Sequence, residues 1–376
     1  MRKNLFGKAA GRLRVVGFSV AIALCGSSSL ALANGTPPPE SVATDQTNAQ
    51  EVVISPPPPA DFNPLSASDA DLDQYGYPPR PDAQSEPDQY ARWKKLVSVP
   101  RTASTKLQQT TINNGPAIHV VEGGTLQDGA TSVKSYNWSG YAVTAKSGKN
   151  GAFTKNKSAI YAEWVVPVAQ QAFGVCNGGY DYSSQWIGFD GFNSSDVLQA
   201  GTEVDAYCSG GSTNTFYSAW YEWYPYDETR VTSPDVQPGD LMGAEVWYTT
   251  AAPYGNAYLV NYTLQQAATY AFNPPAGTTY VGNSAEWIVE RPGVNGGLAN
   301  LTNYVADPFN FDYATYAKST VYPSKGGSKR YAVSMICDDT SWSPGSACSS
   351  TTVISVPYLY GLGTLWFYDE GPAFSN

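Results

Sequence analysis

The sequence predicts an all-β fold, a jelly-roll or concanavalin-like β-sandwich of two antiparallel sheets that follows a largely disordered pro-region. The composition is the first indication, since only 14% of the 376 residues are charged while 13% are aromatic, and these include 27 Tyr. Aromatic and β-branched residues suit the pleated, half-buried surface of a strand. From about residue 136 onward, short alternating runs such as TFYSAWYEWYP are separated by Gly, Asn and Pro turns, which is typical of a sandwich or barrel.

The first element is an export sequence. Basic residues precede an apolar run that ends at Ala31-Leu32-Ala33, so residues 1–33 have the three regions of a signal peptide. A transmembrane anchor is disfavoured because CGSSS interrupts the run and prolines follow it. We therefore expect a secreted protein that has no membrane association once the signal peptide is cleaved.

The second element is a pro-region over residues 34–135. Up to about residue 100 it is rich in Pro, Ala, Asp, Ser and Gln, as in VVISPPPPADFNP, and no apolar periodicity is evident. Such a segment is not expected to bury a core. The remaining residues, 136–376, form the predicted β-sandwich domain, and about 240 residues suffice for one full core.

Charge divides at the same boundary. The first 135 residues carry 12 basic and 12 acidic side chains, whereas the rest carries 10 basic and 20 acidic ones. A domain with this acidic excess is a poor partner for nucleic acid or an anionic membrane. It suits acidic surroundings, where carboxylates are protonated, although simple solubility explains the charge equally well.

Four cysteines follow the signal peptide: Cys176, Cys208, Cys337 and Cys348. An even number in an exported chain indicates two disulfides rather than a thiol nucleophile. Three pairings are possible, and we expect the local ones, Cys176–Cys208 and Cys337–Cys348.

The residue types available limit the chemistry. His119 is the only histidine, and it lies in the predicted pro-region, so a Ser-His-Asp triad, a Cys-His pair and a histidine zinc site are excluded from the domain. The loop DGFNSSD at 190–196 has oxygen ligands for calcium, but it lacks the EF-hand spacing and is better explained as a solvated turn. We expect no metal and no other cofactor. Carboxylate, amide, hydroxyl and indole groups remain, and these favour hydrolysis in acid.

A pentapeptide occurs twice, as AEWVV at 162–166 and AEWIV at 285–289. Strand alternation places Glu286, Ile288 and Glu290 on one face of the second copy. Two carboxylates on one face indicate that the face is not a dry core, because an unpaired buried carboxylate is costly. The first copy has Pro167 where the second has Glu290, so only the second carries the additional acid.

Five blocks, NWSGYAV, QWIGFDG, DVLQAG, AWYEWYP and AEWIVERP, together resemble the eqolisins, the glutamic peptidases. The resemblance spans about residues 135–376. It implies a secreted acid endopeptidase made as a zymogen, with a β-sandwich fold and a catalytic pair formed by Gln199 and Glu290. It also implies protein or peptide substrates, inhibition by the chain's own propeptide, and a monomer.

The same resemblance places further residues in the substrate cleft. Trp138, Trp186, Asp190 and Glu222 match family positions, and Glu286 shares the face of Glu290. Ala200 replaces the usual Thr beside the glutamine, and the cysteine placement differs, which favours a bacterial member. The pro-region, residues 34–135, is called the leader below. Its basic residues are candidates for contacts with carboxylates: Arg92, Lys94, Lys95, Arg101, Lys106 and Lys134.

Two other functions remain open. A jelly-roll glycoside hydrolase also uses paired carboxylates on strands, but Ile288 stands where such enzymes place an aspartate. A non-catalytic, secreted carbohydrate-binding sandwich would use the many Tyr and Asn residues as a surface. A zymogen-like leader disfavours both alternatives.

Overall fold

The structure is a computed structural model of the chain. It describes residues 36–38, 41–42, 50–102, 106–147, 150–172, 176, 180–337 and 352–370. The expected signal peptide lies outside these residues. Within the described ranges, no helix has the length and apolar character that a membrane crossing requires.

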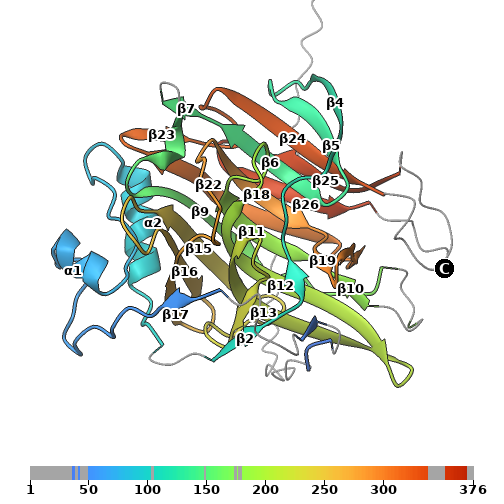
Figure 1. Cartoon of the computed structure of the whole chain (residues 1–376), viewed down its shortest axis with the longest axis horizontal. Helices are drawn as coiled ribbons and strands as arrows, with labels where there is room; N and C mark the ends of the chain where they lie inside the picture. Colours follow the sequence, from blue (N-terminus) through green and yellow to red (C-terminus); the bar gives the residue numbers. More distant parts are fainter. Residues whose placement is uncertain are drawn as a thin grey trace, which may run out of the picture. The chain divides into compact units, whose positions relative to one another are not determined.

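Two sheets of antiparallel strands make up the fold (Figure 1). The first sheet contains, in spatial order, β2 (Leu107–Gln109), β14 (Thr229–Val231), β13 (Ser212–Tyr224), β12 (Val197–Ser209), β11 (Ser184–Phe189), β18 (Ser284–Glu290), β6 (Trp138–Thr144), β24 (Lys329–Ile336), β5 (Thr131–Ser135) and β4 (His119–Thr125). The second contains β25 (Val353–Leu359), β26 (Thr364–Asp369), β22 (Ala306–Tyr316), β9 (Ser158–Val165), β15 (Leu241–Tyr248), β16 (Gly255–Asn261), β17 (Gln266–Phe272) and β1 (Val52–Val53). The predicted two-sheet sandwich is confirmed.

Shorter elements complete the sheets. β24 also pairs with β25 and so connects the two layers. The remaining strands are β3 (Ile112–Asn113), β7 (Lys146–Ser147), β8 (Asn150–Gly151), β10 (Tyr180–Tyr182), β19 (Gly293–Val294), β20 (Gly297–Leu298), β21 (Asn300–Leu301) and β23 (Ser319–Val321), and the helices are α1 (Asp69–Gln74), α2 (Pro87–Val97) and the 3-10 turn η2 (Ala152–Thr154).

The repeated pentapeptides hold the two layers together. Their tryptophans, Trp164 in β9 and Trp287 in β18, point inward and are fully buried in the shared core. The Trp287 indole donates to the carbonyl oxygen of Tyr161 in the opposite sheet at 3.1 Å, and the Trp164 indole donates to Thr202 Oγ1 at 2.9 Å. A buried tryptophan needs such a partner for its N–H group. Both copies therefore serve as the same cross-sheet connection, and alternation turns their acids outward.

Part of the leader has a packed structure that its composition did not predict. Residues 50–102 include α1 and α2, and α2 lies against the outer face of the second sheet (Figure 1). Trp93, Leu96 and Val97 are buried there, packed in one apolar cluster with Trp247 and Tyr258. The spacing of the three helix residues gives one apolar stripe. The expectation that this segment cannot bury a core is wrong for these residues, because they complete a core with another part of the chain.

The first acid of the repeat also contacts this helix. Lys95 Nζ lies 2.5 Å from Glu163 Oε2, and the Glu163 side chain is buried. Among the other candidate cations, Arg92 lies over the ring of Phe311 at 3.5 Å from its centroid. A second ion pair joins Asp73 of α1 to Lys157, just before β9, at 2.7 Å. The leader is thus held on the second sheet by apolar burial together with these ion pairs.

Residues 106–135 continue onto the first sheet. β2 pairs with β14, β3 pairs with β19, and the β4–β5 hairpin joins the sheet through parallel pairing of β5 with β24. The family-like region was expected to begin at 136, yet the sheet includes strands from residue 107 onward. The stretch between β3 and β4 consequently crosses the outer face of the first sheet.

One of the expected disulfides is present, Cys176–Cys208, which closes a loop of 32 residues in sequence. Cys337 is also disulfide-bonded. Its expected partner, Cys348, lies outside the described residues.

Glu245 makes the stability of the fold depend on pH. It lies on the outer face of β15, buried beneath the leader, and burial raises its pKa to about 8. In an unfolded chain the same group ionises near pH 4.3. The folded state therefore binds the proton more tightly, and the stability it contributes is present in acid and lost as the pH rises from about 4.3 towards 8.

We predict that Glu245→Gln stabilises the chain relative to the wild type increasingly between pH 5 and pH 8, because glutamine stays neutral. Each pH unit in this window is worth up to about 1.4 kcal/mol. Urea midpoints at pH 5, 6.5 and 8 measure the effect. Glu122→Gln is the control, since Glu122 is exposed. A constant difference between Glu245→Gln and the wild type at all three pH values contradicts the prediction.

Candidate active site

Three neighbouring strands of the first sheet position the expected catalytic pair. Gln199 on β12 pairs with Gly188 on β11, whereas Glu290 on β18 pairs with Ser184, four positions along β11. The two side chains thus share the outer face of the sheet but lie diagonally across β11. Glycine is required at 188, because a Cβ there would lie 2.9 Å from Gln199 Cβ.

Glu290 is fully buried and hydrogen-bonded on both carboxyl oxygens. Asn137 Nδ2 donates to Oε1 at 3.0 Å, and Trp186 Nε1 donates to Oε2 at 2.9 Å. Burial raises the pKa of Glu290 well above its ordinary value, while these donors act in the opposite direction. The carboxyl therefore holds its proton above the pH at which an exposed glutamate loses it, so beneath this segment it is a proton donor in acid.

A segment of the leader lies directly over this pair. Gln199 Nε2 donates to the carbonyl oxygen of Asn114 at 2.6 Å, and the next backbone N–H, that of Gly115, faces the Glu290 carboxyl. Trp138 Nε1 donates to the Gly115 carbonyl oxygen at 3.0 Å. Although Gln199 and Glu290 are diagonal on the sheet, they meet at a single peptide bond.

The side chain of Asn114 lies between two buried carboxyls. Glu222 on β13 pairs with Gln199, and its Oε2 accepts from the Asn114 backbone N at 3.1 Å and from Asn114 Nδ2 at 3.2 Å. Glu228 Oε2 lies 3.5 Å from the same Nδ2. Burial raises the pKa of Glu222 well above its ordinary value and that of Glu228 to about 8. The Asn114 carboxamide is thus bound between two carboxyl groups that retain their protons above the usual pH.

A cluster of buried charged side chains around Arg230 lies on the same outer face of the first sheet. Arg230 Nε lies 3.3 Å from Glu228 Oε1, and Arg230 Nη2 lies 3.5 Å from Asp205 Oδ2. Ser184 Oγ donates to Glu203. Sequence reasoning missed this cluster because its members come from β11, β12 and β14 and the loop before β14. The alternation of β12 was the available signal, since residues 203 and 205 share the face of Gln199.

Asn137 was also missed, although it begins the N-W-S-G block. Besides its bond to Glu290, its Nδ2 donates to the Pro116 carbonyl oxygen at 3.1 Å, and its Oδ1 accepts from the Ile118 backbone N at 2.8 Å. The ring of Trp138 packs edge-on against that of Trp186 with centroids 5.0 Å apart. These contacts make one polar and aromatic surface beneath the leader segment.

The other two expected cleft residues are Asp190 and Glu286. Asp190 is buried at the end of β11, where its carboxylate accepts backbone N–H groups from Val281 at 3.0 Å, Gly282 at 2.7 Å and Asn283 at 2.9 Å. It therefore fixes the loop that leads into β18, and it is buried although the turn at 190–196 was expected to be solvated. Glu286 is level with Gln199 across Gly188 and fully buried; burial raises its pKa well above the ordinary value, and the nearby Asp190 adds to this.

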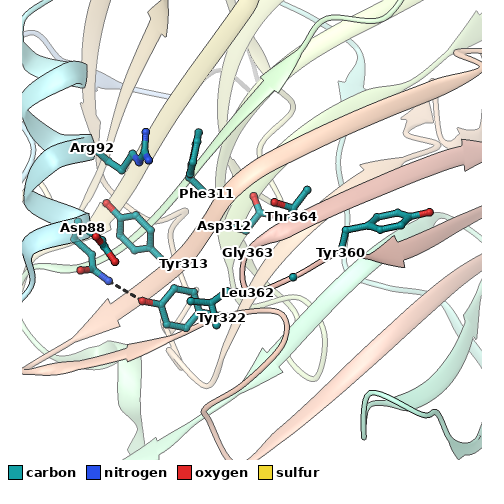
Figure 2. Close-up of a pocket in the computed structure, with 12 residues that line it drawn as sticks. Asp88, Arg92, Phe311, Asp312, Tyr313, Tyr322, Tyr360, Leu362, Gly363 and Thr364 are labelled. Atoms are coloured by element: carbon teal, nitrogen blue, oxygen red, sulfur yellow. Dashed lines mark hydrogen bonds between the residues drawn. The ribbon is translucent and has the colours of Figure 1, made fainter. Parts of the chain in front are cut away.

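A separate cavity of about 350 Å³ lies away from this site (Figure 2). Asp88, Gln89 and Arg92 of α2 line one side, and the turn between β25 and β26 lines the other. Gln89 Nε2 donates to the Tyr322 hydroxyl at 2.9 Å across it. Because α2 supplies one wall, the cavity exists only while the leader is docked, and it contains neither Gln199 nor Glu290.

An antiparallel β-sandwich that holds a peptide over a carboxamide and a buried carboxyl has the architecture of a glutamic-type peptidase. The comparison with known families agrees, since the model of the Peptidase A4 family matches residues 136–353. The chain belongs to the Peptidase A4 family.

Individual relatives support this membership. The chain is 32% identical to aspergillopepsin-2 of Aspergillus niger over 208 residues, which cover 50% of this chain and 68% of that protein. It is 31% identical to scytalidopepsin B of Scytalidium lignicola over 106 residues, or 28% of this chain and 38% of the relative.

Solved structures of similar proteins include scytalido-glutamic peptidase with a transition state analog inhibitor, at 20% identity and a TM-score of 0.48, covering 62% of this chain and 98% of that one. Aspergilloglutamic peptidase from Aspergillus niger matches at 26% identity and a TM-score of 0.39, covering 50% and 99%.

We predict that Trp186→Phe shifts the pH dependence of peptidase activity. The loss of one donor to the Glu290 carboxylate destabilises the charged form and raises its pKa further, so the acid limb of the pH–rate profile moves to higher pH. A hydrogen bond to a charged group is worth about 1.5–3 kcal/mol, which corresponds to about one to two pH units.

The control is Trp220→Phe, which removes an indole from the same outer face. Within the part of the chain that the structure describes, Trp220 Nε1 has no hydrogen-bond partner. Its acid limb should stay where the wild type has it. Equal shifts in both variants would mean that the Trp186 bond does not set the pKa.

Proposed function

We propose that this chain is an exported acid endopeptidase whose catalytic pair is Glu290 and Gln199. The observation that carries the proposal is the shared peptide bond, whose carbonyl oxygen contacts Gln199 Nε2 and whose N–H contacts Glu290. A peptidase needs these two positions, a donor at the developing oxyanion and an acid beside the leaving nitrogen. Export rests on the signal-like residues 1–33.

The chemistry uses groups that work in acid. The ionised form of Glu290 takes a proton from water as the water oxygen attacks the carbonyl carbon, and the protonated carboxyl then gives a proton to the leaving nitrogen. The Gln199 amide is neutral at every pH and donates to the tetrahedral oxyanion. Within the described residues Gln199 Oε1 accepts no hydrogen bond, so it remains available to orient the attacking water. Trp186 and Asn137 position the Glu290 carboxyl.

We also propose that the leader inhibits the enzyme. Gln199, Glu222 and Glu290 are fully buried while the segment around Asn114 lies over them. Access of a second peptide to Glu290 therefore requires this segment to leave. The removable part would then lie upstream of the β4–β5 hairpin, because the hairpin belongs to the first sheet.

We predict that Glu290→Gln and Gln199→Ala each lower hydrolysis of an unfolded protein at pH 3–5 by at least about 100-fold, since loss of one oxyanion donor alone costs about 100- to 1,000-fold. The matched control is Glu163→Gln. Glu163 is the acid of the other pentapeptide, on the second sheet, and it pairs with Lys95 of α2. Activity after acid incubation should be near that of the wild type. Near-wild-type activity of either dyad variant would disprove the assignment.

The same assay separates the alternative functions. A β-glucan is offered at the same pH in parallel with the unfolded protein. Cleavage of the glucan without proteolysis would favour the glycoside hydrolase, and binding without cleavage would favour a carbohydrate-binding sandwich.

We predict a lag for the full chain. Purified at neutral pH and moved to pH 4, it should hydrolyse added substrate slowly at first and then faster as the leader is lost. The measurement is substrate cleavage recorded alongside chain mass. Full activity from the first minute with an intact leader would contradict inhibition.

A further inference from the structure

We propose that Asn114–Gly115 is the bond at which this chain first cuts itself. The leader segment does not merely cover the site, because it lies in the direction and register of a substrate. The inference rests on the proposed function, since it takes Gln199 and Glu290 as the catalytic pair and identifies their first substrate.

The direction of the segment is the first support. Gln199 Nε2 contacts the oxygen of the Asn114 carbonyl, and Glu290 contacts the nitrogen on the other side of the same bond. The oxyanion donor and the proton donor therefore address the two ends of one amide.

Contacts on both sides hold this bond in register. Upstream, Glu222 accepts from the backbone and side chain of Asn114, and the carbonyl oxygen of Ile112 accepts from the Glu228 backbone N at 2.8 Å. Downstream, Trp138 donates to the Gly115 carbonyl oxygen, and the Ala117 backbone N donates to the Gly191 carbonyl oxygen at 3.0 Å. A shift by one residue would break every one of these contacts.

Gly115 is suited to the position after the cut. A Cβ at residue 115 would lie 3.3 Å from a carbon of the Tyr224 ring, so a side chain larger than hydrogen would crowd the ring. The small residue lets the bond lie close to the sheet, where the Glu290 carboxyl is confined by two hydrogen bonds.

The step is balanced as a hydrolysis. The oxygen of water bonds to the Asn114 carbonyl carbon, one water proton passes to Glu290, and the C–N bond breaks as a proton from Glu290 reaches the Gly115 nitrogen. The products are a new carboxyl group at Asn114 and a new amino group at Gly115. The β4–β5 hairpin stays in the sheet on the downstream product.

The test uses the full chain, moved from neutral pH to pH 4 and sampled for intact mass and N-terminal sequence. We expect a first product that begins Gly115-Pro116-Ala117, with a complementary fragment that ends at Asn114. Because the bond lies in the chain's own site, its rate constant should not change over a tenfold range of protein concentration. Glu290→Gln should not be cut there, and Gln199→Ala should be cut about 100- to 1,000-fold more slowly.

A neighbouring pair of variants tests the register. Asn114→Ala removes the amide that contacts Glu222 and Glu228, and it should slow this cut about 3- to 10-fold, the value of a hydrogen bond between neutral groups, because both carboxyls are protonated at pH 4. Asn113→Ala changes the preceding residue, whose amide lies 3.4 Å from Asp227 Oδ1. A hydrogen bond of this length is weak, so the rate of the cut should stay within about twofold of the wild-type rate.

Five results would overturn the inference. A first cut elsewhere, or substrate hydrolysis with Asn114–Gly115 intact, would reject this bond and leave the proposed function standing. Cutting of Glu290→Gln at the wild-type rate, or a gain of about 1 Da at Asn114 from deamidation without chain cleavage, would reject self-hydrolysis. If neither the chain nor an added unfolded protein is cut by the wild type between pH 3 and 5, the proposed function fails as well.

Discussion

The alternation of side chains along β9 and β18 is the constraint on which the rest of the molecule depends. In each strand a tryptophan points inward and donates its indole N–H to the opposite sheet, Trp164 to Thr202 and Trp287 to Tyr161. With period two, the acids must point outward. One strand thereby places Glu163 on the outer face of the second sheet, and the other places Glu290 on the outer face of the first. The inward-facing side chains hold the two sheets together, and the polar side chains of the candidate site lie on an outward-facing surface.

The leader is a ligand for both of those faces. On the second sheet it contributes apolar burial around Trp93 and an ion pair between Lys95 and Glu163. On the first sheet it contributes backbone groups that meet Gln199 and Glu290. The two modes differ physically: helix docking depends on buried area, whereas the segment over the site depends on hydrogen bonds to groups that titrate.

Features that depend on residues near one another in the sequence could be predicted from it. Strand alternation in AEWIVE gave the shared face of Glu286 and Glu290, and the four cysteines gave the Cys176–Cys208 pairing. The packed leader was not predictable in that way, because Trp93 and Leu96 complete a core made of distant strands and stand in a polar, proline-rich stretch. The cluster around Arg230 forms only when β12 and β14 come together. The family resemblance placed Asp190 in the cleft, and nothing in the sequence marked the loop whose three backbone N–H groups donate to it.

Because α2 is docked on the second sheet, a break in the chain ahead of Gly115 would not by itself release the upstream piece. That piece would remain seated by its own buried surface although no covalent bond held it. While the chain is continuous, the tether maintains an effective concentration on the order of millimolar at the site. Once the chain is broken, rebinding depends on the bulk concentration of the fragment. Dilution would then determine when the fragment is released. The cleaved molecule would stay inhibited at high protein concentration and become active once it is diluted.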